Sequence, residues 1–466
     1  MKTATKMAVG LAGLFAAISM GTSAEAQTVV NMGGSSAATP FASLVPVTLC
    51  DANTGVQHIN GDIASPTITA GKLISWSCTR ATTPIVIRYS ASSSSAGIKT
   101  LQQAETNSLS FMPFLDETST TGCTGPTAKS QVIGGVTYNW NQFVGCTGLL
   151  NPGGSPAGAP VQVGWADVGG SSFHQTGPIT TVIKPLDDSA LLVNKTATLP
   201  FSFVLGNGVQ RLNPAGTQVA GPVNSLSQDQ IVAILSRQVT DWRQLGLGTA
   251  PVNGDGSRAA AGTAVDAPSL ITLCIRNAGS GTKATLQVTL LTSGAGEITS
   301  GSTNLLDATE GNVYFNGSTQ DVRDCIAGNT GNSRPAHRHA LGYMETDQAA
   351  LVAAPGGILV PQGYLVKLDG YLPDDPSLTD RQANLKCGKY KFWTIERFNT
   401  RNPSSADANV VTLISDFLVS ATTSANVGDL NPTWVAPGDM QVTKNADGGP
   451  IAFGAAPAKL ACDTIN

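Results

Sequence analysis

The sequence predicts an α/β fold with mainly parallel sheets flanked by helices. Strand-like runs rich in β-branched residues alternate along the 466-residue chain with segments of helical periodicity. Such alternation favours helical crossovers between parallel strands. In addition, three strand-like segments run into Gly/Ser-rich turns that open new helical patterns. The length leaves room for two or three lobes.

The expected elements follow in chain order. Residues 83–90 read as a strand and residues 96–105 as the helix after it. Residues 161–169 read as a strand that leads into a turn, and strands are also expected over 189–194, 201–206, 269–276 and 390–398. Helices are expected over 225–242, 283–293 and 406–421. Two Gly/Pro/Ser-rich stretches, 151–160 and 253–264, read as surface insertions.

The helix over 225–242 has the clearest start signal. Ser227 is placed to cap it, and Gln230 completes the capping-box pattern. Ile231, Ile234 and Leu235 then form one apolar face, which predicts packing against a sheet.

The first 26 residues have the features of a secretory signal peptide. Lys2 and Lys6 precede an apolar run over 7–20, and Ala24–Ala26 form an A-x-A cleavage pattern. The apolar run is too short to span a bilayer. We therefore expect cleavage after about Ala26, no membrane insertion, and a periplasmic or secreted protein.

The eight cysteines agree with that compartment, because an even count is typical of disulfides in an oxidising space. The simplest pairing joins sequential neighbours, Cys50 with Cys78 and Cys123 with Cys146. Spacing alone does not fix connectivity, and free buried thiols are the alternative.

Charge and motifs exclude several function classes. The formal net charge is −4 and only 12% of residues are charged, so we expect no binding to nucleic acid or to an anionic membrane. His337 and His339 lie two residues apart without a cysteine or carboxylate cluster beside them. We expect no metal and no cofactor. A nucleophile with its base is not evident, so we expect no enzyme.

The three strand–turn–helix junctions are candidates for an anion site. They span Met32–Phe41, Ser90–Lys99 and Arg276–Leu286. At such a junction the helix N-terminus presents free N–H groups and a partial positive charge. A single junction is more often a structural turn. Three in one chain, with Arg276 opening the third and no acidic residue near it in sequence, predict an anion site.

Asp167 also follows a strand, and its carboxylate indicates which kind of anion the site would prefer. A carboxylate repels a fully ionised anion but accepts a hydrogen bond from a protonated oxyanion such as hydrogen phosphate. It is also able to pair with Arg276 and orient it. Sulfate, which carries no proton at neutral pH, would leave the carboxylate unpaired. A turn or cap role for Asp167 is the alternative.

Taken in order, these segments resemble the phosphate-binding proteins of ABC-type phosphate uptake, which are type II periplasmic binding proteins. The resemblance rests on "GGSSAATPF", "SSAGIKTL", "GWADV", "ALGYMETDQA" and above all "RNAGSGT". It implies ligand contacts from Ser94, Asp167, Arg276, Ser280, Gly281 and Thr282. For the N-terminal contact it leaves Ala37, Ala38 and Thr39 open, and we take Ala38 and Thr39. Ala96 stands where the family has a glycine.

The resemblance also implies a domain organisation and a function. Two α/β lobes would be joined by a two-stranded hinge near 180–185 and 342–347, with the ligand in the cleft between them. Lobe 1 would comprise 27–178 and 345–466, and lobe 2 would comprise 179–344. The protein would be a monomer that captures phosphate or a similar tetrahedral oxyanion and delivers it to an ABC permease. A secreted protein of the same fold with an adhesive or surface-interaction role is the alternative.

Overall fold

The computed structural model describes residues 27–61, 71–173, 185–219, 222–249, 260–291, 312–328, 337–353, 363–454 and 462. The predicted signal peptide lies outside these residues, as does the predicted hinge segment 180–185 except for Pro185.

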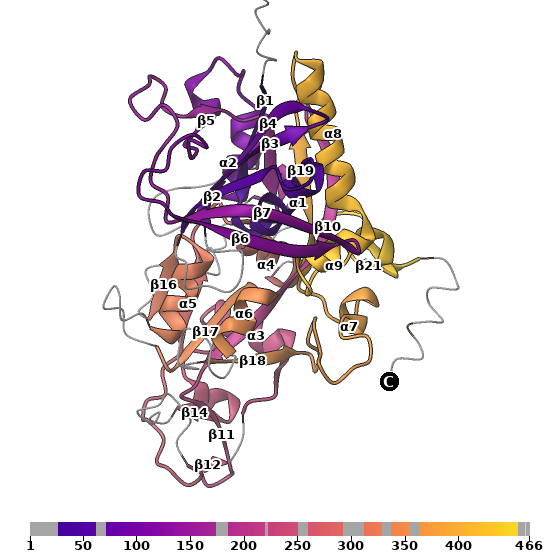
Figure 1. Cartoon of the computed structure of the whole chain (residues 1–466). Helices are drawn as coiled ribbons and strands as arrows, with labels where there is room; N and C mark the ends of the chain where they lie inside the picture. Colours follow the sequence, from indigo (N-terminus) through magenta and orange to yellow (C-terminus); the bar gives the residue numbers. More distant parts are fainter. Residues whose placement is uncertain are drawn as a thin grey trace, which may run out of the picture.

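One large mixed sheet organises the described part of the chain (Figure 1). Its strands follow the order β16-β15-β17-β10-β19-β9-β1-β4-β3-β2-β7-β6, and β18 and β13 branch from β10. The α/β class predicted from the sequence is confirmed. The strands are β1 Thr28–Ser35, β2 Gly55–Gly61, β3 Gly71–Arg80, β4 Thr83–Ser92, β6 Thr124–Ile133, β7 Val136–Val144, β9 Val163–Ala166, β10 Leu192–Gly206, β13 Ser225–Leu226, β15 Thr272–Arg276, β16 Val313–Asn316, β17 Ala340–Glu345, β18 Gly363–Leu368 and β19 Trp393–Thr400.

Smaller elements complete the architecture. Three short sheets contain β5 Phe111–Met112 with β8 Ala159–Pro160, β11 Val209–Leu212 with β12 Gln218–Val219 and β14 Leu247–Thr249, and β20 Val442–Lys444 with β21 Ile451–Phe453. The α-helices of the described residues are α1 Thr39–Leu49, α2 Ser94–Leu101, α3 Gln228–Leu235, α4 Gly281–Leu286, α5 Thr319–Ala327, α6 Thr346–Ala353, α7 Ala383–Lys386, α8 Ala408–Thr422 and α9 Ser424–Leu430.

The elements form two lobes. We call β1–β4, β6, β7 and β9 with α1, α2, α8 and α9 the first lobe, which is the upper part of Figure 1. The second lobe contains β15–β18 with α3–α6. In each lobe a central strand is flanked by two parallel neighbours: β1 by β4 and β9, and β15 by β16 and β17. Parallel strands in each set therefore end at one edge, where their connecting turns gather.

Strand β10 passes through both lobes. Its first half, Leu192–Pro200, pairs antiparallel with β19, and Phe201–Leu205 pairs with β17. Strand β18 also pairs with the second half of β10, so α6 and β18 pack with the second lobe. The predicted lobe boundaries at 178 and 344 and the predicted hinge stay predictions.

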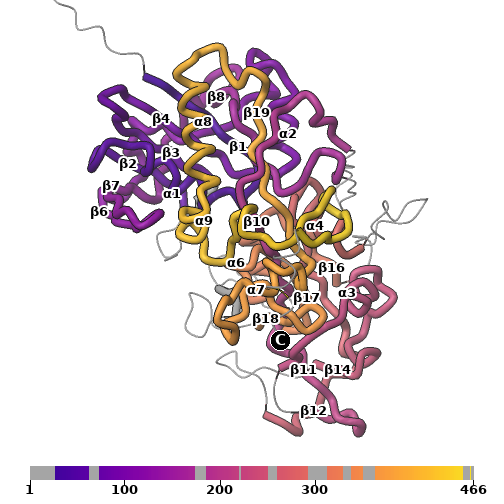
Figure 2. The backbone as a smooth tube through the Cα atoms, turned by 90° about the vertical axis from the view of Figure 1, so that its right-hand side faces the viewer, coloured from indigo at the N-terminus to yellow at the C-terminus, as the bar shows by residue number. Residues whose placement is uncertain are grey.

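Aromatic packing fixes the helices of the first lobe against its sheet. Phe41 of α1 stacks on Trp165 of β9 with ring centroids 4.9 Å apart, and Phe417 of α8 packs against Phe398 of β19. All four side chains are fully buried. Helix α8, near the C-terminal end of the sequence, therefore lies beside the N-terminal strand β1 (Figure 2).

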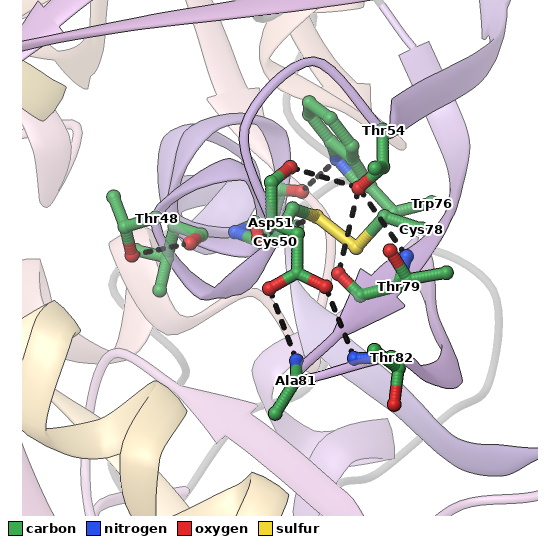
Figure 3. Close-up of a disulfide and its surroundings, with 12 residues drawn as sticks. Thr48, Cys50, Asp51, Thr54, Trp76, Cys78, Thr79, Ala81 and Thr82 are labelled. Atoms are coloured by element: carbon green, nitrogen blue, oxygen red, sulfur yellow. Dashed lines mark hydrogen bonds between the residues drawn. A yellow bond between two sulfur atoms is a disulfide. The ribbon is translucent and has the colours of Figure 1, made fainter.

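Disulfides pair all eight cysteines: Cys50–Cys78, Cys123–Cys146, Cys274–Cys325 and Cys387–Cys462. The two pairs expected from sequence neighbours are confirmed. Cys50–Cys78 ties the end of α1 to β3 (Figure 3). Such a set is typical of proteins that fold outside the cytoplasm.

The β3–β4 hairpin beside that disulfide contains backbone strain. Ala81 and Thr82 form its two-residue turn with φ values of 46° and 75°. The Asp51 carboxylate accepts from both turn N–H groups at 3.0 and 3.2 Å, and these bonds lower the pKa of Asp51 (Figure 3). The turn is therefore held by Asp51 although its residues do not favour it.

Replacing Thr82 with glycine is expected to stabilise the protein by about 0.5–1 kcal/mol. A β-branched residue at positive φ costs about 1–2 kcal/mol, which exceeds the entropic cost of glycine. Urea denaturation measures the difference. The control Thr83→Gly changes the adjacent strand residue, whose φ is not positive, and should destabilise. Equal effects of both substitutions would contradict the strain argument.

Within the described residues, no single helix is both long and apolar enough to cross a membrane. Helices α8 and α9 reach that length only as a pair bent by 79°.

Candidate functional site

The first junction places hydroxyl groups at the end of β1. Ser35 ends the strand, and a 3₁₀ turn, Ser36–Ala38, leads into α1. The Ser35 Oγ accepts from the Ala37 N–H at 3.1 Å and donates to the Asp167 carboxylate. Tyr89 of β4 donates to the Ser35 carbonyl. These bonds hold Ser35 at the sheet edge rather than in solvent.

The second junction joins β4 to α2. Ser93 caps the helix by accepting from the Ala96 N–H at 3.2 Å, and Ser94 donates to Asp167 Oδ1 at 2.9 Å. Gly97 lets α2 lie directly on β9, because a Cβ at this position would lie 2.3 Å from the Trp165 carbonyl oxygen. The helix N-terminus is thereby fixed beside the strand ends.

The third junction belongs to the second lobe. Arg276 ends β15, and Ser280 caps α4 by accepting from the Lys283 N–H at 3.3 Å. The helix runs on through a π-helical turn, Gln287–Leu291. Thr282 donates to Glu345 at 3.4 Å. Burial lowers the pKa of Lys283 to about 7, and its ammonium lies 4.9 Å from the Phe315 ring centre.

These junctions meet at one pocket with an empty volume of about 150 Å³, its open mouth included. The two lobes contact each other there, because the Ser95 N–H donates to the Gly279 carbonyl at 3.2 Å. At Gly281 a Cβ would lie 2.3 Å from Ser94 Oγ and 2.5 Å from Asp167 Cγ. The lining residues are Ser35, Ser36, Ser92, Ser93, Ser94, Asp167, Arg276, Ser280, Gly281 and Thr282.

Arg276 is the cation of this lining. Its side chain is 4% exposed. Nη1 donates to Thr319 Oγ1 at 2.7 Å and lies 3.9 Å from Glu345 Oε1, while Thr319 donates to Glu345 in turn. Nε has no hydrogen-bond partner among the described residues. Glu345 thus supplies the acidic neighbour that the local sequence lacks, and the buried Nε–H of the guanidinium has no partner among the described residues.

Asp167 lines the pocket and is 2% exposed. Burial raises its pKa, and the nearby Glu345 raises it further. Hydrogen bonds from Ser35 and Ser94 and the charge of Arg276 act in the opposite direction. The Asp167 side chain accepts hydrogen bonds from the hydroxyls of Ser35 and Ser94 and makes none with Arg276.

The structure brings together six of the eight residues predicted from the sequence, namely Ser94, Asp167, Arg276, Ser280, Gly281 and Thr282. Ala38 and Thr39 do not line the pocket, and Ser35 and Ser36 stand there instead. Ala38 is fully buried, and Thr39 donates to the Ser36 carbonyl at 2.6 Å. The reason is that β1 ends at Ser35 and the following turn carries Ala38 into the core.

Sequence reasoning also missed Glu345, Glu396, Ser92 and Ser93 around the site. The serines were detectable, because they are hydroxyl residues at a strand end next to a predicted contact. The two glutamates lie within strands and reach the site only through strand pairing. Within the described residues, no group of three or more His, Cys, Asp or Glu side chains is placed to hold a metal ion.

Comparison with solved structures gives distant similarities. The chain is similar to a substrate-binding protein assigned to phosphate ABC transport, with bound phosphate, from Clostridium perfringens, at 12% identity over 88% of this chain and 99% of that one, with a TM-score of 0.44. It is also similar to an ABC-type phosphate transport receptor from Vibrio cholerae, at 12% identity over 59% of this chain and 80% of that one, with a TM-score of 0.32. No curated protein matches.

The sequence over residues 187–422 matches the family model of the PBP superfamily domain. This segment includes β10, the third junction with Arg276, and β17 and β19, which contribute Glu345 and Glu396. It amounts to just over half of the chain, and it contains the strands that run between the two lobes. The chain therefore belongs to the PBP superfamily domain family.

Proposed function

We propose that this protein is an extracytoplasmic solute-binding protein that captures phosphate or a similar tetrahedral oxyanion between its lobes for ABC transport. The observation that carries the proposal is the convergence of Arg276 and the hydroxyls of three strand–helix junctions on one pocket. Family membership supports a solute-binding role, and the predicted signal peptide and the four disulfides support export.

The donors of the pocket suit an oxyanion. A guanidinium makes strong charge-assisted hydrogen bonds, and Arg276 Nε is buried without another partner among the described residues. The hydroxyls of Ser36 and Ser92 and the N-terminus of α2 offer donors from the first lobe, while Ser280 adds a hydroxyl from the second. A tetrahedral anion has enough acceptor lone pairs to engage both lobes at once.

The acids of the pocket favour a ligand that brings a proton. Asp167 lines the pocket, and Glu345 already interacts with Arg276. A fully ionised anion would face the negative Asp167 carboxylate without a proton to donate to it, whereas hydrogen phosphate would donate a hydrogen bond to it. Phosphate and arsenate are therefore favoured over sulfate.

Binding and lobe closure would be one event. We place lobe 1 at 27–178 and lobe 2 from 179, with β18 and α6 on the second-lobe side of the hinge because they pair and pack there. Each lobe carries only part of the donor set, so the ligand has higher affinity for the closed arrangement. An ABC permease would then recognise the closed protein.

Isothermal titration calorimetry of the mature protein with inorganic phosphate tests the proposal. One-to-one binding of phosphate with weaker binding of sulfate is expected. The absence of binding to phosphate, arsenate and sulfate would overturn it.

Replacing Asp167 with asparagine is expected to narrow the preference for phosphate over sulfate by about fivefold or more. The neutral amide no longer repels sulfate, and its NH₂ group donates a hydrogen bond where a carboxylate oxygen accepted one. Leaving a buried polar group without a partner costs about 1–3 kcal/mol of binding free energy. Competition calorimetry with both anions gives the ratio. The control Asp416→Asn alters a partly exposed carboxylate paired with Arg80 and should leave the ratio unchanged. An unaltered ratio in Asp167→Asn would remove the selective role.

A further inference from the structure

Glu396 of β19 is a neighbour of Asp167 and does not line the pocket. Strands β9 and β19 pair antiparallel, and their last registered pair is Ala166 with Arg397. One position further, Asp167 stands opposite Glu396. The Thr394 hydroxyl also joins the two strands beyond this pair, because it donates to the Asp167 backbone carbonyl at 2.5 Å. Opposite residues of an antiparallel pair project from the same face, so the two carboxyl groups are neighbours.

The surroundings offer Glu396 no donor. Its side chain is fully buried, and neither carboxyl oxygen has a hydrogen-bond partner among the described residues. An ionised carboxylate buried without a donor is costly, and such a group takes up a proton instead.

The charged and titratable groups around the pair have other partners. Arg397, next on β19, is bound to Asp447 at 2.7 Å, and Tyr89 of β4 donates to Ser35. Glu345 of β17 accepts from Thr319 at 2.8 Å and lies near Arg276 of β15. Asp167 is therefore the neighbouring group that is able to accept a hydrogen bond from a protonated Glu396.

From this geometry we infer that Glu396 is held in its protonated form and donates a hydrogen bond to the Asp167 carboxylate, so that the two groups carry one negative charge between them. The direction of the pKa agrees: burial raises the pKa of Glu396 well above its ordinary value, and the nearby Asp167 and Glu345 raise it further. Glu396 is then a positioning residue, which orients Asp167 without lining the pocket.

The consequence for ligand binding rests on the proposed function. With the pair singly charged, Asp167 is free to accept from a protonated oxyanion. When the pH rises enough to ionise the pair, a second negative charge develops under the pocket and opposes the anion. Affinity for phosphate should therefore fall at alkaline pH as the pair loses its shared proton.

Stability gives a test that does not need a ligand. A carboxyl whose pKa is raised by folding holds a proton that the unfolded chain has released above about pH 4.3. Unfolding then releases a proton, so its contribution to stability declines as pH rises from there to the folded pKa. Over this window the folding equilibrium should lose up to about tenfold per pH unit from this group.

The experiment compares wild type with Glu396→Gln, whose amide also donates to Asp167 but does not titrate. Difference infrared spectra of the phosphate-free proteins at neutral pH should contain a protonated-carboxyl band in wild type that the variant lacks. Thermal denaturation at a series of pH values gives the melting temperature Tm, which should fall less steeply with rising pH in the variant than in wild type. Glu117→Gln is the contrasting control, because Glu117 accepts two 2.7 Å bonds from Arg88 and its loss should destabilise.

The outcomes separate this inference from the proposed function. Loss of the band in Glu396→Gln, together with a flattened stability profile, supports the acid pair even where no oxyanion binds at any pH. Phosphate binding with no protonated-carboxyl band assignable to Glu396 overturns the acid pair and leaves the proposed function standing. Should Glu396→Gln fail to fold, the infrared band of wild type is assigned by its shift on ¹³C labelling of glutamate; its absence overturns the inference.

Discussion

Replacing Arg276 with alanine is expected to weaken phosphate binding by at least about 30-fold. Removing one partner of a buried, hydrogen-bonded charge pair costs about 2–5 kcal/mol, and each 1.4 kcal/mol is tenfold in affinity. The Arg276 side chain is 4% exposed, and its Nε–H has no other partner in the described part of the chain. Calorimetry with phosphate measures the loss.

Three further variants make that result specific. Arg243→Ala removes a guanidinium that is 44% exposed and bound to Asp241, and it should leave phosphate affinity unchanged. Arg276→Lys keeps the charge but loses the planar fork, so an intermediate loss is expected. Because Arg276→Ala also leaves Glu345 without its cation, Glu345→Gln in the same background should restore stability but not binding. An affinity for phosphate within threefold of wild type in Arg276→Ala would contradict the site.

Replacing Gly281 with alanine is expected to prevent lobe closure and to reduce phosphate affinity by at least about 100-fold. The added Cβ would lie 2.3 Å from Ser94 Oγ and 2.5 Å from Asp167 Cγ, well inside van der Waals contact. The segment that carries Gly281 must move about 1 Å away from Ser94 and Asp167. This shift lengthens the hydrogen bonds that a ligand makes to both lobes beyond bonding distance. Two charge-assisted bonds at about 1.5–3 kcal/mol each account for the loss.

The control for this effect is Gly428→Ala. Gly428 lies within α9, and a Cβ there meets nothing within 4 Å. This change should leave binding unaltered and stabilise the helix by about 0.5–1 kcal/mol. Small-angle scattering should report a more open shape for Gly281→Ala with phosphate than for wild type with phosphate. Identical profiles at saturating phosphate would show that Gly281 is not where the lobes close.

Local chemistry was predictable where neighbours in sequence are the partners. The capping box of Ser227 and Gln230 is confirmed, because both groups bond to the backbone within one helical turn. The same helix ends at Leu235 rather than near residue 242, since Arg237 adopts a φ of 60° and Trp242 begins a separate 3₁₀ turn capped by Asp241. The helical pattern of apolar residues in the sequence extends past Leu235, although the backbone leaves the helix there.

Pairing between distant strands was not predictable in the same way. The segments 189–194 and 201–206 were expected as separate strands. Residues 192–194 and 201–206 instead belong to one strand, β10, since β19 pairs along its first half and β17 along its second. Glu345 and Glu396 likewise reach the site through pairing, and their local sequence does not distinguish them from surface strand residues.

The sequence by itself determined the fold class and the strand–turn–helix junctions that form the proposed anion site, because such junctions are local patterns. Only the tertiary structure decided that Ser35 and Ser36, rather than Ala38 and Thr39, line the pocket, because the pairing of β1 with β4 extends to Ser35 and sets where the strand ends. It also gave Arg276 its acidic partner Glu345, and Asp167 its buried neighbour Glu396. The physical reason is the same in each case: charge and burial depend on distances between strands, and those distances are set by packing across the whole sheet.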